Sequence, residues 1–104
     1  MTNKEVWIGL IDCVALSDNN ILDGARSAAV NILALASDEA EYCKEVRKAL
    51  NDFGLGLKSI EDAEPISNRL IRYTIADELL KLAEEVTSAG GVRFGTFHTY
   101  ENET

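Results

Sequence analysis

The sequence has few of the residues that small catalytic, metal-binding or disulfide-rich domains require. In 104 residues it contains one histidine, His98, one proline, Pro65, and two cysteines, Cys13 and Cys43, which have no paired spacing. A zinc site needs several thiolate or imidazole ligands, and a nucleophilic cysteine needs a neighbouring base. We therefore expect no metal, no cofactor and no enzymatic activity. Both cysteines are predicted to be reduced and to pack as small apolar side chains.

Membrane-spanning and phosphate-binding features are also missing. No apolar run approaches the ~20 residues that cross a bilayer, and residues 1–5 lead directly into a predicted strand instead of a secretory signal peptide. Gly54, Gly56, Gly90 and Gly91 follow predicted helices, so they do not form the loop before a helix that holds a phosphate. We expect a cytoplasmic protein with no membrane partner.

Acidic residues outnumber basic ones, 18 to 10, which gives a formal net charge of −8. Such a field repels nucleic acid and anionic membranes and attracts basic partners. Solubility alone is also a sufficient reason for a net charge of this size. The charge therefore argues against direct nucleic-acid binding without identifying a partner.

The segment 29–60 organises the predicted fold. Apolar residues 29–36 precede a helical pattern over 37–53, and a second apolar run covers 55–60. This order predicts a helix that crosses the sheet between two parallel strands. Asp38 and Glu41 have the spacing of a reciprocal capping arrangement at the helix start, and Gly54 can end the helix in the left-handed conformation.

The rest of the chain predicts two further strands and one further helix. Residues 6–16 are apolar on both alternating sets, so both faces of this strand should be covered, and it should pair antiparallel with the strand 28–36. Residues 67–88 form the second predicted helix; alternatively Thr74 caps its start and 67–73 form a strand or turn. The segment 92–100 predicts the last strand. Residues 21–27 are compatible with a hairpin or with a helical turn.

The predicted architecture is α+β, with a single α/β domain over residues 1–104. We expect a single-layer mixed sheet of four strands in the order β-β-α-β-α-β, with both helices packed on one face because each carries one apolar stripe. The other sheet face would then be a binding or a dimer surface.

Few side chains are candidates for function. Glu61, Asp62 and Glu64 crowd together before the proline in what we predict to be a loop, which is either solvated or binds Lys or Arg of a partner. Asp12 is either a strand-end carboxylate or, less simply, a catalytic one, and His98 is predicted at a surface or strand edge. The aromatic residues are interpreted as core or as one exposed patch: Trp7, Phe94, Phe97 and Tyr100.

Three stretches, together with the length, charge and layout of the chain, resemble small immunity proteins of bacterial contact-dependent growth inhibition systems. They are residues 5–12 (EVWIGLID), 61–65 (EDAEP) and 93–100 (RFGTFHTY). The resemblance implies a cytoplasmic, non-enzymatic toxin inhibitor. It would bind the C-terminal toxin domain that a neighbouring cell delivers, commonly a basic nuclease such as an RNase, and cover its active site.

On this hypothesis the acidic segment and nearby aromatic residues face the toxin, and the protein is a monomer in the toxin complex. The predicted partner-binding residues are Glu61, Asp62, Glu64, Tyr100, Glu101, Trp7 and Asp18. The alternative is a small-ligand-binding or regulatory α/β domain that acts as a homodimer through its open sheet face. An enzyme ranks third, because the sequence contains no evident pair of nucleophile and base.

Overall fold

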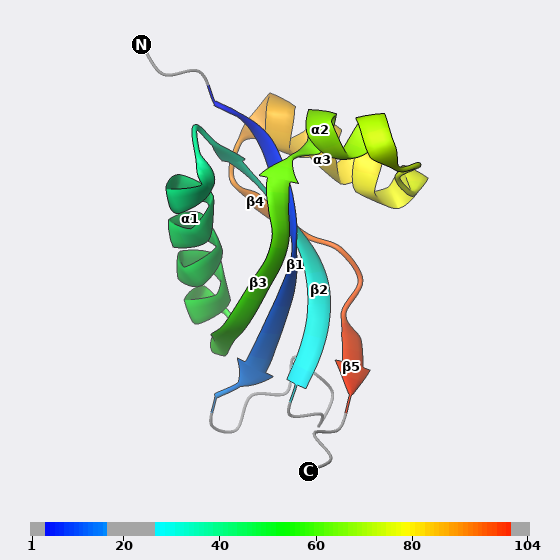
Figure 1. Cartoon of the computed structure of the whole chain (residues 1–104). Helices are drawn as coiled ribbons and strands as arrows, with labels where there is room; N and C mark the ends of the chain where they lie inside the picture. The colour runs from blue at the N-terminus through cyan, green and yellow to red at the C-terminus, as the bar shows by residue number, and fades with distance from the viewer. Residues whose placement is uncertain (1–3, 17–26, 101–104) are drawn as a thin grey trace.

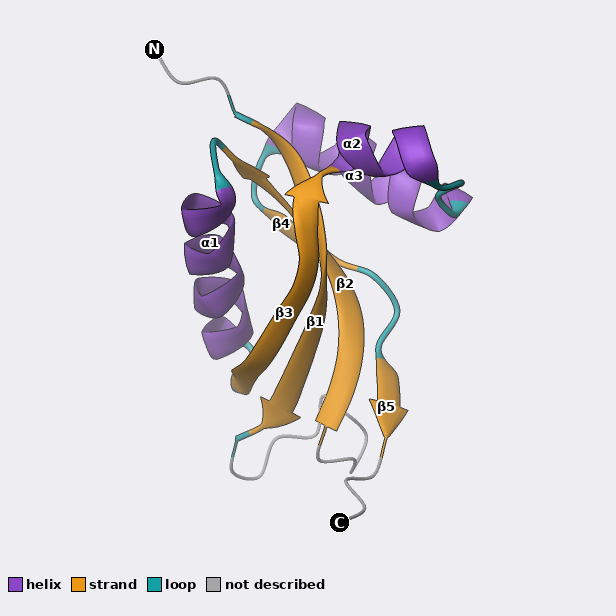
Figure 2. Cartoon of the chain, viewed as in Figure 1, coloured by secondary structure: helices purple, strands orange, loops and turns teal. Residues whose placement is uncertain are grey.

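A computed structural model of the chain describes residues 4–16 and 27–100 (Figure 1). Figure 2 distinguishes its helices from its strands by colour. In chain order they are β1 (Glu5–Ala15), β2 (Ser27–Ala36), α1 (Glu39–Asp52), β3 (Leu55–Pro65), α2 (Ile66–Arg72), α3 (Asp77–Ala89), β4 (Val92–Phe94) and β5 (His98–Tyr100). The α+β class is confirmed. The ambiguous residues 21–26 lie outside the described part of the chain.

The described strands form one sheet in the order β3-β1-β2-β4, and β5 pairs with the other end of β2. Every pairing among these strands is antiparallel, so the prediction of a mixed sheet is wrong. β1 and β2 are antiparallel neighbours as expected. β2 and β3 do run in the same direction, but β1 lies between them and hydrogen-bonds to both. Helix α1 therefore crosses over β1 to reach the far edge of the sheet.

The helices lie on opposite faces of the sheet, which corrects the expectation that both share one face (Figure 1). α1 packs on the face that carries Ile11, Cys13 and the even-numbered residues of β2. α3 packs on the other face, against Val6, Ile8 and Leu33. The physical reason lies in β1 and β2, which are apolar on both alternating sets and therefore need cover on both sides.

Tyr42 fastens α1 to the sheet. Its side chain is fully buried, its hydroxyl donates a hydrogen bond of 2.7 Å to the carbonyl of Ile32, and its ring stacks on Trp7 with centroids 6.1 Å apart. The ring also lies over Gly9, where a Cβ atom would come within 2.8 Å of the Tyr42 hydroxyl. Gly9 is thus required for close approach. It also lies opposite a bulge in the pairing of β1 with β3, in which the extra residue belongs to β3.

The start of α1 is capped as expected, except that the Glu41 carboxylate bonds one residue earlier than in the usual reciprocal arrangement. The Asp38 carboxylate accepts from the Glu41 N–H at 2.8 Å, as predicted. The Glu41 carboxylate reaches back to the N–H of Ser37, at 2.6 Å, one residue before the cap, and also accepts from the Ser37 hydroxyl. Lys4 lies 3.0 Å from the other oxygen of Glu41. Gly54 ends the helix at φ 73°, as predicted.

Two predicted elements are divided in the structure. The second helix is interrupted between α2 and α3, and Ala76, not Thr74, is the N-cap of α3. Residues 66–72 are helical, which excludes the strand alternative. The last strand is interrupted at residues 95–97, where the Gly95 N–H donates to the carbonyl of Asn31. The described chain therefore has three helices and five strands instead of the expected two and four.

Substitution of Gly9 by alanine should destabilise the fold through Tyr42. The added Cβ would overlap the tyrosine hydroxyl, and overpacking of this kind costs about 1–3 kcal/mol. Tyr42→Phe removes the overlapping atom. It also removes the hydrogen bond to Ile32, and this loss costs about 1–2 kcal/mol of stability. Urea unfolding should therefore show that the double variant loses less stability than the sum of the losses in the two single variants. Simple additivity within ~0.5 kcal/mol would contradict the contact.

Glu41→Gln should lower the free energy of unfolding at neutral pH. The N–H of Ser37, then Lys4 and the Ser37 hydroxyl, lower the pKa of Glu41 to about 2. The unfolded-state pKa is ~4.3, so the stabilisation is complete above that pH and is lost as the pH falls towards 2. Urea unfolding of both proteins from pH 7 to pH 2.5 should show curves that converge in acid. Glu39→Gln, in the same helical turn, is the control, and an equal convergence there would refute the assignment.

Candidate functional site

The acidic segment is part of a strand, so the prediction of a loop over 61–65 is wrong. β3 continues to Pro65, with Glu61 opposite Leu10 and Glu64 opposite Ile8 of β1. Between these pairs, two residues of β3 stand against one of β1, which makes a bulge. Asp62 occupies the bulge at φ 56°, a left-handed conformation that aspartate adopts more readily than most residues. The segment is not a loop because its pairing with β1 continues past Ile60.

Part of the sheet face opposite α1 has little cover. Residues that pair across strands share a face, so the register places side chains in rows. Ile8 and Leu33 form a buried row beneath α2 and α3, whereas Leu10 in the next row is 38% exposed. We call the partly exposed rows the open sheet face. They are Glu61–Leu10–Asn31 and Ser59–Asp12–Ala29–His98.

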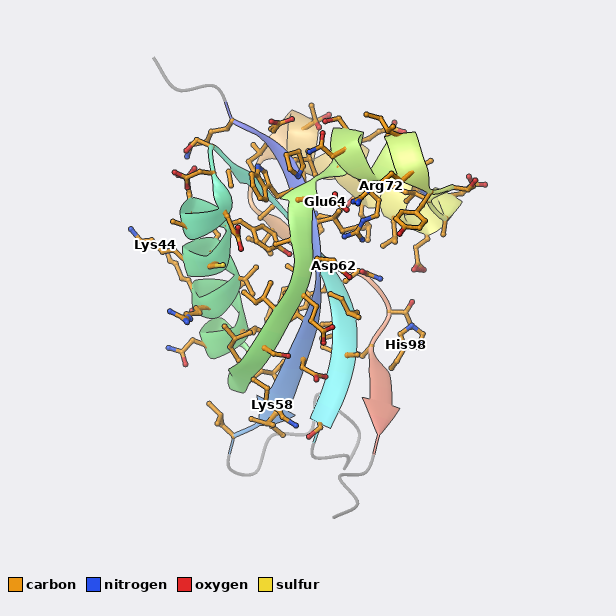
Figure 3. All side chains as sticks on the ribbon, viewed as in Figure 1. Lys44, Lys58, Asp62, Glu64, Arg72 and His98 are labelled. Atoms are coloured by element: carbon orange, nitrogen blue, oxygen red, sulfur yellow. The ribbon has the colours of Figure 1, made fainter. Side chains whose placement is uncertain are left out.

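Where β3 meets α2, a cavity of about 270 Å³ opens between the two elements. Arg69 Nε lies 2.7 Å from a Glu64 oxygen, and its Nη2 donates to the carbonyl of Asp62 at 2.5 Å. Arg72 pairs with the second oxygen of Glu64, and its guanidinium lies 5.5 Å from the centroid of the Tyr73 ring. Figure 3 labels Glu64 and Arg72 where β3 meets α2. We call Glu61, Asp62, Glu64, Arg69, Arg72 and Tyr73, with Leu10 beside them, the β3–α2 corner.

The three predicted carboxylates are not equivalent. Glu64 is largely buried, with 15% of its side chain exposed, and two arginines neutralise it. The Arg69 hydrogen bond, aided by the charge of Arg72, holds the pKa of Glu64 below its usual range. Glu61 and Asp62 are exposed, and neither carboxylate takes part in the ion pairs found among the described residues. Only these two remain available to attract a cation.

Helix α2 adds exposed apolar surface to the corner. None of its residues is buried, and 82% of Ile71 and 48% of Leu70 are exposed. Tyr73, the next residue after the helix, is 60% exposed. Tyrosine and arginine are enriched among the residues that contribute most to protein–protein binding, whereas isolated exposed leucines are common. The corner thus combines apolar anchors with flanking acid.

The other predicted partner-binding residues do not join this corner. Trp7 is half-buried on the α1 face, and its Nε1 is buried with no hydrogen-bond partner among the described residues. Tyr100 of β5 pairs with Ser27 of β2. β5 is three strands away from β3, and neighbouring strands are ~4.8 Å apart. Its side chain, Asp18 and Glu101 lie outside the described part of the structure.

The residues weighed for catalysis and metal binding lie apart. Cys13 is fully buried in the α1-side core, and burial, then the charge of Asp12, raises the pKa of its thiol. Cys43 is half-buried with a pKa also raised by burial, and His98 is exposed on β5. Both thiols are free. In the ranges 4–16 and 27–100, no group of three or more His, Cys, Asp or Glu is arranged to hold a metal ion.

The aromatic residues divide between core and surface. Phe94 lies edge-on to Phe53, with centroids 5.2 Å apart, and 5.7 Å from Phe97. This cluster packs against the α1-side core, whereas half of Phe53 is exposed. No helix in the described part of the chain is long and apolar enough to cross a membrane.

Sequence reasoning missed Arg69, Arg72 and Tyr73. The missed signal was the spacing of Glu64 from the two arginines, five and eight residues later, with a proline between. A strand that turns directly into a helix at Pro65 brings these residues together. With the turn unrecognised, Glu64 was grouped with the exposed acids.

Comparison of the chain with protein-family models, with curated proteins and with solved structures found no match. The candidate site is therefore defined by its own geometry: exposed carboxylates near the end of the edge strand β3, beside a helix with exposed apolar side chains.

Loss of the Glu64 charge should loosen α2. This helix has no fully buried residue and no side-chain N-cap. Ile66 packs on the core at its start, and the bonds from Arg69 and Arg72 to Glu64 hold the remaining turn against β3. In Glu64→Gln, amide hydrogen exchange in residues 66–72 should become several-fold faster while exchange in α1 is unchanged. Glu61→Gln is the matched control and should leave α2 protected. Equal exchange in the two variants would show that α2 is held by other contacts.

Proposed function

We propose that this protein is a cytoplasmic immunity protein that neutralises a cognate contact-dependent inhibition toxin domain, a basic nuclease such as an RNase. It acts by binding and covering the toxin's active site, without catalysis. The observation that carries the proposal is the exposed, unneutralised pair Glu61 and Asp62 beside Leu10 and Tyr73 on a chain of net charge −8. The resemblance of residues 5–12, 61–65 and 93–100 to such immunity proteins supports the same conclusion.

The corner supplies the interactions that inhibition of a nuclease requires. A nuclease cleft positions Lys and Arg for phosphate groups, and exposed carboxylates can occupy the same positions. Complementary fields raise the association rate, whereas contacts that exclude water slow dissociation. Glu61 and Asp62 supply the first effect. Leu10, Ile71 and Tyr73 supply the second, because their exposed apolar surface would be buried on docking.

Glu64 has a positioning role in this proposal. Its charge is already satisfied by Arg69 and Arg72, so a toxin would have to displace one arginine to use it. Breaking a well-paired charge costs more than an exposed pair returns. We therefore assign toxin contact to Glu61 and Asp62, and assign Glu64 to holding α2 beside them.

The direct experiment begins with the gene upstream of this chain: if it encodes a large secreted protein that ends in a toxin domain, that C-terminal domain is co-purified with this protein. A stable 1:1 complex, and loss of the toxin's activity on RNA or DNA in that complex, would support the proposal. A homodimer that survives in the absence of any toxin, and that binds a small molecule in the 270 Å³ cavity, would favour a regulatory domain instead.

Glu61→Lys with Asp62→Asn should slow toxin association by about tenfold or more at low salt, because electrostatic steering is worth 10–10³ in rate. Asparagine is chosen at position 62 because it tolerates the positive φ. Surface plasmon resonance across ionic strengths would measure the change, and protection of cells from the toxin would fall with it. Asp77→Asn with Glu84→Lys, on α3, changes the net charge equally. Equal slowing by this control would remove the corner from the interface.

A further inference from the structure

A second cleft lies on the opposite side of the molecule from the open sheet face, between the C-terminal half of α1 and β4. Its volume is about 300 Å³. Its floor is apolar and aromatic and consists of Ala49, Phe53, Val92 and Phe94. Phe53 is 50% exposed and meets Phe94 edge-on, so the two rings are held in place while one remains accessible.

The rim of the cleft is charged. Glu45, Lys48 and Asp52 follow one another at i, i+3 and i+7 on α1, so they lie along one side of the helix. None of the ion pairs found in the described part of the chain involves any of the three. Lys48 precedes Asp52, which is the weaker order for a helical pair. The rim therefore has two carboxylates and one ammonium group around an aromatic floor, which leaves it with a net negative charge.

This chemistry selects the occupant. A cation above an aromatic face is attracted by the ring, more strongly when water is excluded, and long basic side chains bury their aliphatic stems on apolar surface. An uncharged apolar ligand would desolvate the two carboxylates without compensation, and an anion would be repelled. A volume of 300 Å³ accommodates one long side chain rather than a folded segment. Arginine fits best, because its planar guanidinium can stack on a ring and hydrogen-bond to a carboxylate at the same time.

We propose that the α1–β4 cleft binds an arginine side chain presented by a protein partner. The aliphatic stem would lie on Val92 and Phe94, and the guanidinium would lie over Phe53 between Glu45 and Asp52. This inference does not rest on the proposed function. It concerns a different surface from the β3–α2 corner, and it applies to any partner that exposes an arginine.

The test is a titration of Nα-acetyl-arginine amide into ¹⁵N-labelled protein, followed by amide chemical shifts. Nα-acetyl-citrulline amide, which has nearly the same shape but no charge, is the comparison probe. Saturable shifts centred on residues 45–53 and 92–94, in the millimolar range and at least several-fold weaker for citrulline, are expected. Equal binding of both probes, or shifts spread over the acidic surface, would overturn the proposal. Because no toxin is present, its failure leaves the proposed function intact, and the reverse also holds.

Variants of the rim separate a built site from general attraction to an acidic protein. Glu45→Gln with Asp52→Asn should weaken arginine binding several-fold, and Lys48→Gln should strengthen it by removing the competing cation. Phe53→Leu keeps the cleft apolar but removes the ring, so it should also weaken binding. Asp77→Asn with Glu84→Gln removes the same charge from α3. Equal weakening in the two double variants would show that net charge alone attracts the probe, and would refute the cleft.

Discussion

The contact of Tyr42 with the sheet is the interaction on which the rest of the structure depends. Its hydroxyl satisfies the carbonyl of Ile32, its ring stacks on Trp7, and the absence of a side chain at Gly9 lets it approach the backbone. Because Tyr42 lies in the first turn of α1, it sets the path of the helix across β2 and β1. The chain then returns as β3 at the far edge, which is where the exposed acids lie.

The two candidate surfaces follow from this layout. α1 covers one sheet face and leaves a cleft beside β4, whereas α2 and α3 cover only part of the other face. The short helix α2 has no fully buried residue; Ile66 packs on the core, and two charge pairs to Glu64 hold the rest of the helix. A protein of net charge −8 thus has two different surfaces that could attract a cation. One has carboxylates beside exposed apolar side chains of α2, and the other has carboxylates beside aromatic rings.

Much of the local structure could be predicted from the sequence, whereas the site could be predicted only in part. The apolar periodicities located β1, β2 and α1, and Asp38 and Gly54 marked the ends of that helix. The division of 67–88 was foreseen only as a strand or turn before Thr74, and two separate helices were not predicted. Leu70 and Ile71 continue the apolar spacing of α3 although they lie on the surface. Glu61, Asp62 and Glu64 were recognised as a cluster, but the arginines that neutralise Glu64 were not.

By itself, the sequence determined what each short segment prefers, since propensity, capping and apolar spacing act over a few residues. It also determined that β1 and β2 need cover on both faces, because both of their alternating sets are apolar. Only the tertiary structure decided that β1 lies between β2 and β3, that α1 and α3 take opposite faces, and that two of three neighbouring carboxylates stay exposed. Those outcomes depend on hydrogen bonds and charge pairs between segments, whose partners no local pattern specifies.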